Sequence, residues 1–216
     1  MARHNPSMNA PEVLRRIVGD RNLHARLLNT LARMEYVGAR KILKSRRAED
    51  LDGDGLQHVL EEVAHSLRLK RAAEKVGDDP ECVRTFDEAH TLAGRAGEDY
   101  VQGVDAAAAA VLGDVSEPRR TELNYLLSSV LIEVRAERFY REYDRVLADA
   151  ETAVRVTTIY KDEVRHLAEM EERLDADLPD WRDRAAPATE REDELFVAWI
   201  AAVERVLDRA PSPAPV

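Results

Sequence analysis

The sequence is short of several features that define common protein classes. Among its 216 residues there is one cysteine, Cys82, so no disulfide can form within the chain. Glycine and proline number nine each, aromatic residues make up 5%, and the alternating β-branched and aromatic runs that mark strands are missing. No stretch is apolar over the length of a membrane span, and the opening MARHNPSMNAPEV has no apolar targeting core. We therefore expect an all-α protein that is cytoplasmic and has no membrane partner.

The charge balance narrows the set of partners. A formal net charge of -10 repels a phosphate backbone, so we expect no nucleic acid partner. Hydrophobic residues make up 44% and charged residues 34% of the chain, which is typical of a folded globular protein. Alanine, leucine, glutamate and arginine dominate, and all four favour helices. The length suffices for one domain with a full core.

Apolar residues recur at helical spacing in four long segments. Breaks between them fall at the Asp-Gly run of residues 50–55, at Gly77 and Pro80, and at GDVSEP, residues 113–118. The pattern predicts an antiparallel four-helix bundle with core helices at 21–45, 56–76, 119–148 and 151–174.

Two segments lie outside the predicted bundle. Residues 84–112 form an insert that reads as helical, and residues 189–209 form an extra amphipathic C-terminal helix. The apolar face of that helix makes it a candidate contact in a homodimer. Residues 1–10 and 211–216 have the composition of disordered ends, which leaves 11–210 as a single helical domain.

Two glutamates fall on the apolar side of their helices. Glu35 lies one turn from Leu31 on the stripe of the first core helix, so its carboxylate points toward the core. Glu133 has Val130 and Ala136 as neighbours at one turn on the third core helix. Each glutamate can also reach solvent from the edge of its stripe as an ordinary surface charge.

Glu137 competes with Glu133 for the inward position on the third core helix, because residues one turn apart share a face. Arg141 follows Glu137 by one turn, which suits a surface ion pair. We therefore choose Glu133 as the inward residue and keep Glu137 as a neighbour of the site.

The second and fourth core helices each carry a Glu-x-x-His pair. These pairs are Glu62 with His65 and Glu163 with His166. On a helix, residues i and i+3 lie on one face, so both side chains of a pair can reach one ion. A carboxylate with an imidazole suits iron, manganese or zinc.

The order of these residues along the chain strengthens the pattern. It runs Glu, Glu-x-x-His, Glu, Glu-x-x-His, each on a separate predicted helix. Glu62 follows Glu35 by 27 residues and Glu163 follows Glu133 by 30, about the length needed to travel along one helix, turn and return to the same depth. Four carboxylates and two imidazoles at one level form a di-metal centre in such bundles. Bound cations would also offset the repulsion between four buried acids.

Two short motifs carry a family resemblance. Residues 162–166 read DEVRH, similar to the DExRH motif of oxygen-activating di-iron proteins, and residues 61–65 read EEVAH, with Ala64 in place of the arginine. With the ligand order, the four core helices resemble the ferritin-like di-iron carboxylate superfamily, which includes rubrerythrins, ribonucleotide reductase small subunits and bacterial multicomponent monooxygenases. The resemblance implies a ferritin-like bundle holding two iron ions, with Mn–Fe or Mn–Mn as alternatives. The implied metal ligands are Glu35, Glu62, His65, Glu133, Glu163 and His166.

Four further residues are candidates for a place beside the metals. Glu61 and Asp162 each precede a ligand glutamate, where they either accept the second ring N–H of the histidine on the opposite helix or are ordinary surface acids. Tyr160, one turn before a ligand, is either a core tyrosine or a redox-active neighbour. We expect His58 on the helix surface or beside the ligands, and the alternative is an extra ligand.

Three functions are compatible with these residues. The favoured one is a di-iron oxidase or hydroxylase, which uses O₂ or peroxide to oxidise an unidentified small organic molecule at the metal centre itself. The second is iron handling, namely ferroxidation, storage or peroxide scavenging. The third is a non-enzymatic interaction bundle. The segments outside the bundle favour the first, because they can exclude water and shape a pocket. We expect its apolar wall to include Leu27, Leu31, Val59, Val130 and Ile159.

Overall fold

The structure, a computed structural model, describes residues 10–45 and 51–209. Within these ranges it contains seven α-helices, one short 3-10 helix and no strand, which confirms the all-α class. In chain order the elements are α1 (Ala10–Val18), α2 (Arg21–Ser45), α3 (Gly53–Val76), η3 (Pro80–Val83), α4 (Gly94–Ala110), α5 (Arg119–Asp149), α6 (Thr157–Asp177) and α7 (Trp181–Arg209).

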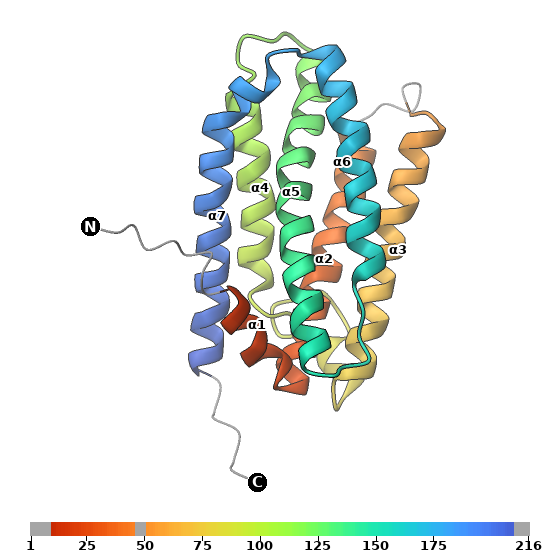
Figure 1. Cartoon of the computed structure of the whole chain (residues 1–216), viewed down its shortest axis with the longest axis vertical. Coiled ribbons are helices and arrows are strands. Elements are labelled where there is room, and N and C mark those ends of the chain that lie inside the picture. Colours follow the sequence, from red (N-terminus) through yellow and green to blue (C-terminus); the bar gives the residue numbers. More distant parts are fainter. Residues whose placement is uncertain (1–9, 46–50, 210–216) are drawn as a thin grey trace, which may run out of the picture.

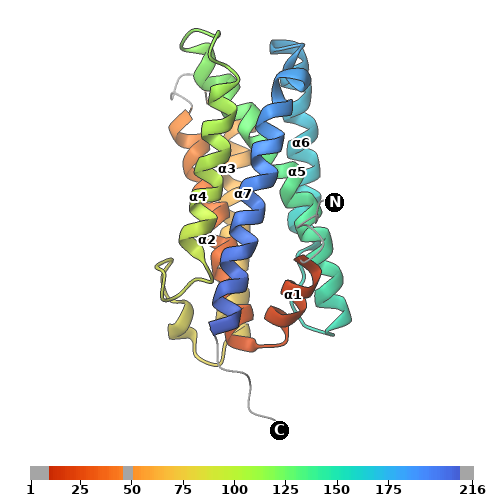
Figure 2. The same cartoon turned by 90° about the vertical axis from the view of Figure 1, so that its left-hand side faces the viewer.

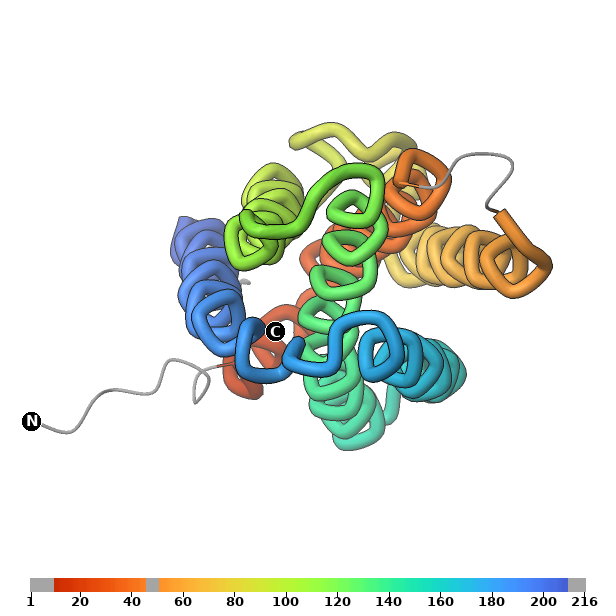
Figure 3. Tube along the Cα trace, turned by 90° about the horizontal axis from the view of Figure 1, so that it is seen from above, coloured from red at the N-terminus to blue at the C-terminus, as the bar shows by residue number. Residues whose placement is uncertain are grey.

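The six long helices run alternately up and down (Figure 1). Helix α2 packs most closely on α3, α5 on α6, and α4 on α7. Seen along their common direction, α2 and α5 lie in the middle, with α3 and α6 on one side and α4 and α7 on the other (Figure 3). The short α1 packs at the lower end against α2, α5 and α7. The helices that carry the Glu and Glu-x-x-His residues, α2, α3, α5 and α6, are therefore adjacent.

The direction of α5 depends on α4. Helix α3 ends at the lower end in Figure 1, and α4 carries the chain back to the upper end. As a result α5 runs parallel to α3 and antiparallel to α2. Figure 2 shows α4 and α7 side by side over one flank of the molecule. Helix α4 is thus a long crossover that lies outside the group of α2, α3, α5 and α6.

Two clusters of buried apolar side chains fill the interior, and a polar level separates them along the helices. On α2, Leu31 belongs to one cluster and Ile42 to the other, with the position of Glu35 between them. On α6, Ile159 and Met170 belong to different clusters in the same way. Apolar packing on both sides holds the inward polar residues at a fixed depth.

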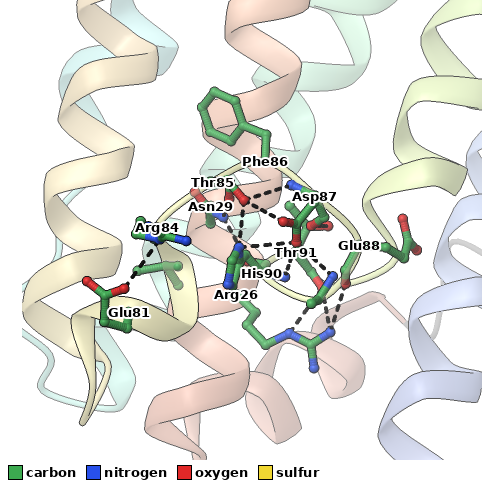
Figure 4. A network of polar contacts seen from close by, with 12 residues as sticks. Arg26, Asn29, Glu81, Arg84, Thr85, Phe86, Asp87, Glu88, His90 and Thr91 are labelled. Carbon is green, nitrogen blue, oxygen red and sulfur yellow. Dashed lines mark hydrogen bonds and ion pairs between the residues drawn. The ribbon is translucent and has the colours of Figure 1, made fainter.

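The insert predicted at 84–112 becomes helical only at α4, and its first ten residues form turns against α2 (Figure 4). The side-chain amide of Asn29 donates to the carbonyl oxygens of Thr85, at 2.8 Å, and His90, at 2.7 Å. Asp87 accepts from the backbone N–H of His90 at 3.2 Å. Side chains therefore make hydrogen bonds with backbone N–H and C=O groups that would pair with each other in a helix, and these bonds keep the stretch from being helical.

The fourth core helix, predicted from residue 151, begins instead at Thr157 as α6. Glu151 has a backbone φ of 52°, a left-handed conformation that interrupts helical geometry after α5. Asp144 then accepts hydrogen bonds from the backbone N–H of Val156, at 3.3 Å, and the hydroxyl of Thr157, at 2.9 Å. These contacts fix the start of α6 later than the apolar pattern indicated.

The C-terminal helix is longer than the predicted 189–209. Helix α7 begins at Trp181 and continues through Pro187. A proline inside a helix removes one N–H and costs about 3 kcal/mol. The buried side chains of Trp181 and Ala185, which pack into the second apolar cluster, offset this cost.

The apolar face of α7 packs inside the chain rather than facing outward. Phe196 and Trp199 are buried among aromatic side chains of α4 and α5. The surface proposed from sequence as a dimer contact is therefore occupied internally. The exposed large apolar side chains include four on α3, which are Leu56, Leu60, Val63 and Leu67.

Two sequence expectations concern the ends and the membrane. The disordered ends predicted at 1–10 and 211–216 lie outside the described residues, except that Ala10 begins α1. In the ranges that are described, no helix has the length and apolar content that a membrane crossing requires.

Candidate metal centre

Six side chains from four adjacent helices meet at the polar level. Helix α2 supplies one carboxylate, α5 another, and α3 and α6 each supply a Glu-x-x-His pair. Five of the six are buried, and Glu35 is partly buried. Burying so many ionisable groups together is costly unless they pair with each other or bind cations. The exposed fractions of the buried five are 7% for Glu62, 1% for His65, 6% for Glu133, 3% for Glu163 and 1% for His166.

The ligand atoms fall into two sets, each compact enough to hold one ion. In each set, the atoms offered by the four residues lie within 4.8 Å of one another. Glu62 belongs to both sets and therefore stands where a bridging carboxylate would stand. The first set is Glu35, Glu62, His65 and Glu163, and the second is His58, Glu62, Glu133 and His166.

The two histidines of the pairs are held by acids from the opposite helix. Nε2 of His65 on α3 lies 3.0 Å from Oδ2 of Asp162 on α6. Nε2 of His166 on α6 lies 2.7 Å from Oε2 of Glu61 on α3. This crossed arrangement is the contact that the sequence suggested, while its role toward a metal-bound histidine stays a prediction. It leaves Nδ1 of each ring directed at the interior.

Several buried atoms of the site have no hydrogen-bond partner. His65 Nδ1 lies 3.1 Å from Oε1 of Glu163 but is not aligned for a hydrogen bond. Buried polar atoms are nearly always satisfied, so a group of unsatisfied ones at one place calls for an explanation such as an ion. The unpartnered atoms of the site are Nδ1 of His65, Nδ1 of His166, Oε2 of Glu133 and Oε1 of Glu163.

Two carboxyls of the site hold their protons strongly. Burial, followed by the neighbouring charges of Glu163 and Glu35, raises the pKa of Glu62 well above its usual range. Burial, followed by Glu163 and Glu62, raises the pKa of Glu133 in the same way. Without cations, the cluster therefore keeps part of its negative charge neutralised by protons.

His65 on α3 and Glu163 on α6 form an ion pair, which balances the negative charge that remains in the cluster. Burial opposes protonation of His65, but contacts with Glu163 and Glu35 outweigh it and raise the pKa of the imidazole to about 11. Burial likewise opposes ionisation of Glu163, yet its contacts with His166 and His65 lower its pKa. A divalent cation at this point would take the place of the protons on the imidazoles.

Glu61, the acid that contacts His166, is held by Arg165 of the DEVRH motif. Nη2 of Arg165 lies 2.8 Å from Oε2 of Glu61, whose other carboxylate oxygen accepts from Gln57 at 2.9 Å. Burial raises the pKa of Glu61, but its bonds to Arg165 and His166 outweigh burial and lower it to about 2. The carboxylate thus stays ionised and oriented toward His166. On α3 the position corresponding to Arg165 is Ala64, so Asp162 lacks this particular support.

Gly38 makes room for the shared carboxylate. A Cβ atom at this position would lie 2.8 Å from Oε2 of Glu62, closer than carbon and oxygen approach. The glycine on α2 therefore lets the carboxylate of α3 lie against its backbone, one turn from Glu35.

Tyr140 contacts the site, although the sequence pattern did not single it out. Its hydroxyl donates a short hydrogen bond to Oε1 of Glu35, and burial followed by Glu35 raises its pKa well above the usual range. Tyr140 lies two turns after Glu133 on α5, and that spacing is the signal that could have identified it. The tyrosine chosen from sequence, Tyr160, instead lies under the guanidinium of Arg141, 5.3 Å from its ring centre.

His58 lies within the site, so of the two places expected from sequence, the helix surface and a position beside the ligands, the structure excludes the surface. Its side chain is 13% exposed, and its Nε2 lies 3.3 Å from Oε1 of Glu62 and 3.7 Å from Oε1 of Glu133. Burial, followed by the charge of His166, lowers the pKa of His58 to about 3, so the ring is neutral at neutral pH. A neutral imidazole has a nitrogen lone pair that can bind a cation.

Glu137 lies outside both ligand sets. It pairs with Arg141 one turn further along α5, the partner that the sequence indicated. Glu133 is the α5 residue that reaches the cluster, so the choice between the two follows from the helix rotation that the structure shows. That Glu133 binds a metal stays a prediction.

A cavity of about 100 Å³ adjoins the carboxylates. It reaches from Glu35, Glu62 and Glu133 toward α4 and α7, where aromatic side chains line it. Of the five apolar wall residues expected from sequence, only Leu31 lines it, because the cavity opens toward α4 and α7 rather than along the bundle axis. Apolar and aromatic lining residues include Met34, Ile42, Tyr100, Phe139, Phe196 and Trp199.

Comparisons with protein-family models, with curated proteins and with solved structures gave no match. The residues themselves supply the test of a metal site. Carboxylate oxygens and imidazole nitrogens are ligands that iron and manganese accept, and the unpartnered atoms are those that two cations would bind. The donor set therefore fits a pair of divalent ions.

Proposed function

We propose that this chain is a di-metal carboxylate protein of the ferritin-like class, which uses O₂ or peroxide to oxidise a small organic molecule. The observation that carries the proposal is the meeting of four carboxylates and two imidazoles from four helices, with unpartnered atoms at its centre. Simple core packing gives no reason for this grouping, because each buried ionisable group costs free energy.

The helix connections support the ferritin-like assignment. Ferritin-like bundles contain one long crossover connection. Here α4 occupies that place, because it returns the chain along the full bundle between the pair α2–α3 and the pair α5–α6 (Figure 1). The Glu-x-x-His pairs then lie on the second and fourth helices of the group and the single glutamates on the first and third.

Iron is the metal we propose, with Mn–Fe or Mn–Mn as alternatives that share the ligand types. Such a pair of ions, when bound, supplies redox equivalents for reducing O₂ or peroxide. Glu35, His65 and Glu163 would hold one ion, Glu133 and His166 would hold the other, and Glu62 would serve both. Asp162 and Glu61 would keep the ring nitrogens of His65 and His166 in one orientation.

Other residues of the chain shape the surroundings of the ions. The hydroxyl of Tyr140 donates to Glu35 and so restrains the carboxylate that faces the cavity. Phe139, Phe196 and Trp199 line the part of the cavity that faces α7 and make this part of its wall apolar. The buried ion pair of Arg135 with Glu192, at 2.7 Å, fixes α7 against α5 behind these rings.

The cavity volume favours a second candidate function. About 100 Å³ is less than the roughly 150 Å³ that holds a benzene molecule in an engineered core cavity. A site this small suits ferroxidation, in which Fe(II) itself is the substrate and O₂ or peroxide the oxidant, without movement of α4 or α7. An organic substrate would have to be small or would require these helices to separate.

Anaerobic loading with Fe(II) followed by exposure to O₂ tests the proposal. We expect about two irons per chain, retained through repeated reduction and oxidation, and loss of binding in Glu163→Ala but not in Glu172→Gln, an exposed acid on the same helix. Accumulation of ferric mineral well beyond two irons per chain would favour iron storage. A protein that binds neither iron nor manganese would leave only the interaction bundle.

A further inference from the structure

The two halves of the site differ at one position. Residues 58 and 159 are equivalent in the Glu-x-x-His pattern, since each lies one turn before the glutamate of its pair. On α3 this position is His58, whereas on α6 it is Ile159, which is fully buried in an apolar cluster. One half of the site therefore has an imidazole where the other half has only hydrocarbon.

His58 is placed as a ligand would be. Its Nε2 lies 3.3 Å from Oε1 of Glu62 and 3.7 Å from Oε1 of Glu133. Its ring centre lies 4.0 Å from that of His166, so the two imidazoles approach the same side of the cluster. The nitrogen of His58 thus enters the compact set that contains Glu62, Glu133 and His166.

The second nitrogen of His58 is also engaged. Its Nδ1 lies 3.3 Å from the hydroxyl oxygen of Tyr125 on α5. A histidine that binds a metal through one nitrogen usually donates the other N–H to a fixed acceptor. His65 and His166 follow this rule with Asp162 and Glu61, and His58 follows it with the oxygen of Tyr125.

We propose, on the basis of the di-metal function above, that His58 is a seventh ligand, which binds the ion on the Glu133 side of the site. The ion beside Glu35 then has three carboxylates and one imidazole, and the ion beside Glu133 has two imidazoles and two carboxylates. The two positions differ in donor chemistry. Nitrogen-rich sites favour metals late in the divalent series over manganese, whereas oxygen-rich sites suit manganese. The asymmetry gives this chain a means of binding two different metals in a fixed order.

Anaerobic titration with Co(II) tests the assignment, because its visible absorption reports ligand type and its binding can be counted. The variants are His58→Ala, Tyr125→Phe and the control His90→Ala. His90 lies in the turns before α4, bonds to Thr85 and belongs to neither ligand set. We expect two Co(II) per chain in the parent protein and in His90→Ala. In His58→Ala we expect the second Co(II) to bind at least tenfold more weakly, and in Tyr125→Phe a smaller weakening in the same direction.

Chemical rescue separates loss of a ligand from loss of the fold. Free imidazole added to His58→Ala should restore the second Co(II) and its absorption, whereas a misfolded variant would not respond. Metal-free melting curves of His58→Gln, which keeps a polar side chain of similar length, provide a second check on folding. Two equally tight Co(II) in both histidine-58 variants would overturn the seventh ligand while leaving the di-metal proposal intact. A parent protein that binds no Co(II), Mn(II) or Fe(II) would overturn both.

Discussion

Oε1 of Glu163 on α6 lies 3.1 Å from Nδ1 of His65 on α3. The two residues belong to different Glu-x-x-His pairs and are 98 positions apart in the chain. The glutamate of one pair therefore faces the histidine of the other, and neither pair forms a site by itself. Since the contact spans the α3–α6 interface, binding of a cation there should couple the two helices and stabilise the fold.

Replacing Glu133 and Glu137 of α5 by alanine, one at a time, tests which of the two binds the proposed metals. In Glu133→Ala we expect loss of most bound metal, because the variant removes a buried carboxylate of the second ligand set. Glu137→Ala removes the partner of Arg141 and should leave metal content unchanged. Metal content per chain, measured after purification from iron-supplemented cells, decides the matter. Retention in the first variant with loss in the second would show that α5 is rotated by one turn relative to the structure.

Substitution of Gly38 should separate metal binding from folding. In Gly38→Ala the new methyl group would lie only 2.8 Å from the present position of Oε2 of Glu62, so the carboxylate must move. Alanine also favours the helix by about 0.5–1 kcal/mol relative to glycine. We therefore expect an unchanged or higher melting temperature without metal, together with at least tenfold weaker binding of Mn(II).

The matched control is Gly53→Ala at the start of α3, where nothing lies within 4 Å of the added carbon. It should leave metal affinity unchanged. If Gly38→Ala bound metal as tightly as the control, the close approach of Glu62 to α2 would have no role in the site.

Metal binding should release protons. Without metal, the pKa of His65 is about 11, so its imidazole carries a proton at neutral pH, and the raised pKa values of Glu62 and Glu133 make these carboxyls hold their protons to higher pH than ordinary glutamates. Cations bind the deprotonated forms, so affinity should increase from about pH 6 to about pH 8. Release can be followed with a pH indicator in weakly buffered solution during Mn(II) addition. An affinity independent of pH across this range would contradict these protonation states.

The same groups determine how stability without metal depends on pH. The folded chain holds the proton of His65 up to about pH 11, whereas the unfolded chain loses it near the ordinary pKa of 6.5. The stabilisation of the fold by the proton on His65 is complete below pH 6.5 and is lost as the pH rises toward 11. The raised pKa values of Glu62 and Glu133 also lower the stability of the fold as the pH rises above 4.5. Denaturant midpoints should therefore fall between about pH 7 and about pH 9 without metal, and fall less with Mn(II) bound. A midpoint that rose with pH in the metal-free protein would contradict this.

The acid that holds His65 should influence metal affinity from outside the ligand sets. Asp162→Asn keeps the shape of the side chain but removes the charge that accepts the Nε2 proton of His65. We expect tenfold to about 100-fold weaker metal binding with the helical content unchanged. The control is Glu172→Gln on the exposed side of α6, which should bind as the parent does. Equal affinities in both variants would assign Asp162 to the surface.

The long helices and the meeting of the six residues could be predicted from the sequence, because both follow from helical periodicity and from residue spacing. Apolar periodicity fixes the inward face of each helix, and the 27-residue and 30-residue separations match an out-and-back path. Glu35, Glu62 and Glu163 therefore meet as the spacing predicted. The helix ends were less accessible, because side chains such as Asp144 and Asn29 fix them through contacts across the fold.

The places of His58, Tyr140 and the cavity depended on helix packing that no periodicity reveals. A histidine one turn before Glu62 lies near the edge of the inward face, and only the rotation of α3 against α5 decides whether it points inward. Tyr140 reaches Glu35 across the gap between α5 and α2. The cavity opens toward α7 because α4 and α7 form a third pair of helices, whose docking the sequence did not predict.

The most direct test of the di-metal centre is anomalous X-ray scattering at the iron edge, from crystals of the protein loaded anaerobically with Fe(II). The proposed arrangement predicts two peaks per chain about 3.5–4 Å apart, one beside Glu35 and His65 and the other beside Glu133 and His166, with Glu62 next to both. A single peak, peaks confined to the surface, or no peak at these residues in fully loaded crystals would contradict the di-metal centre.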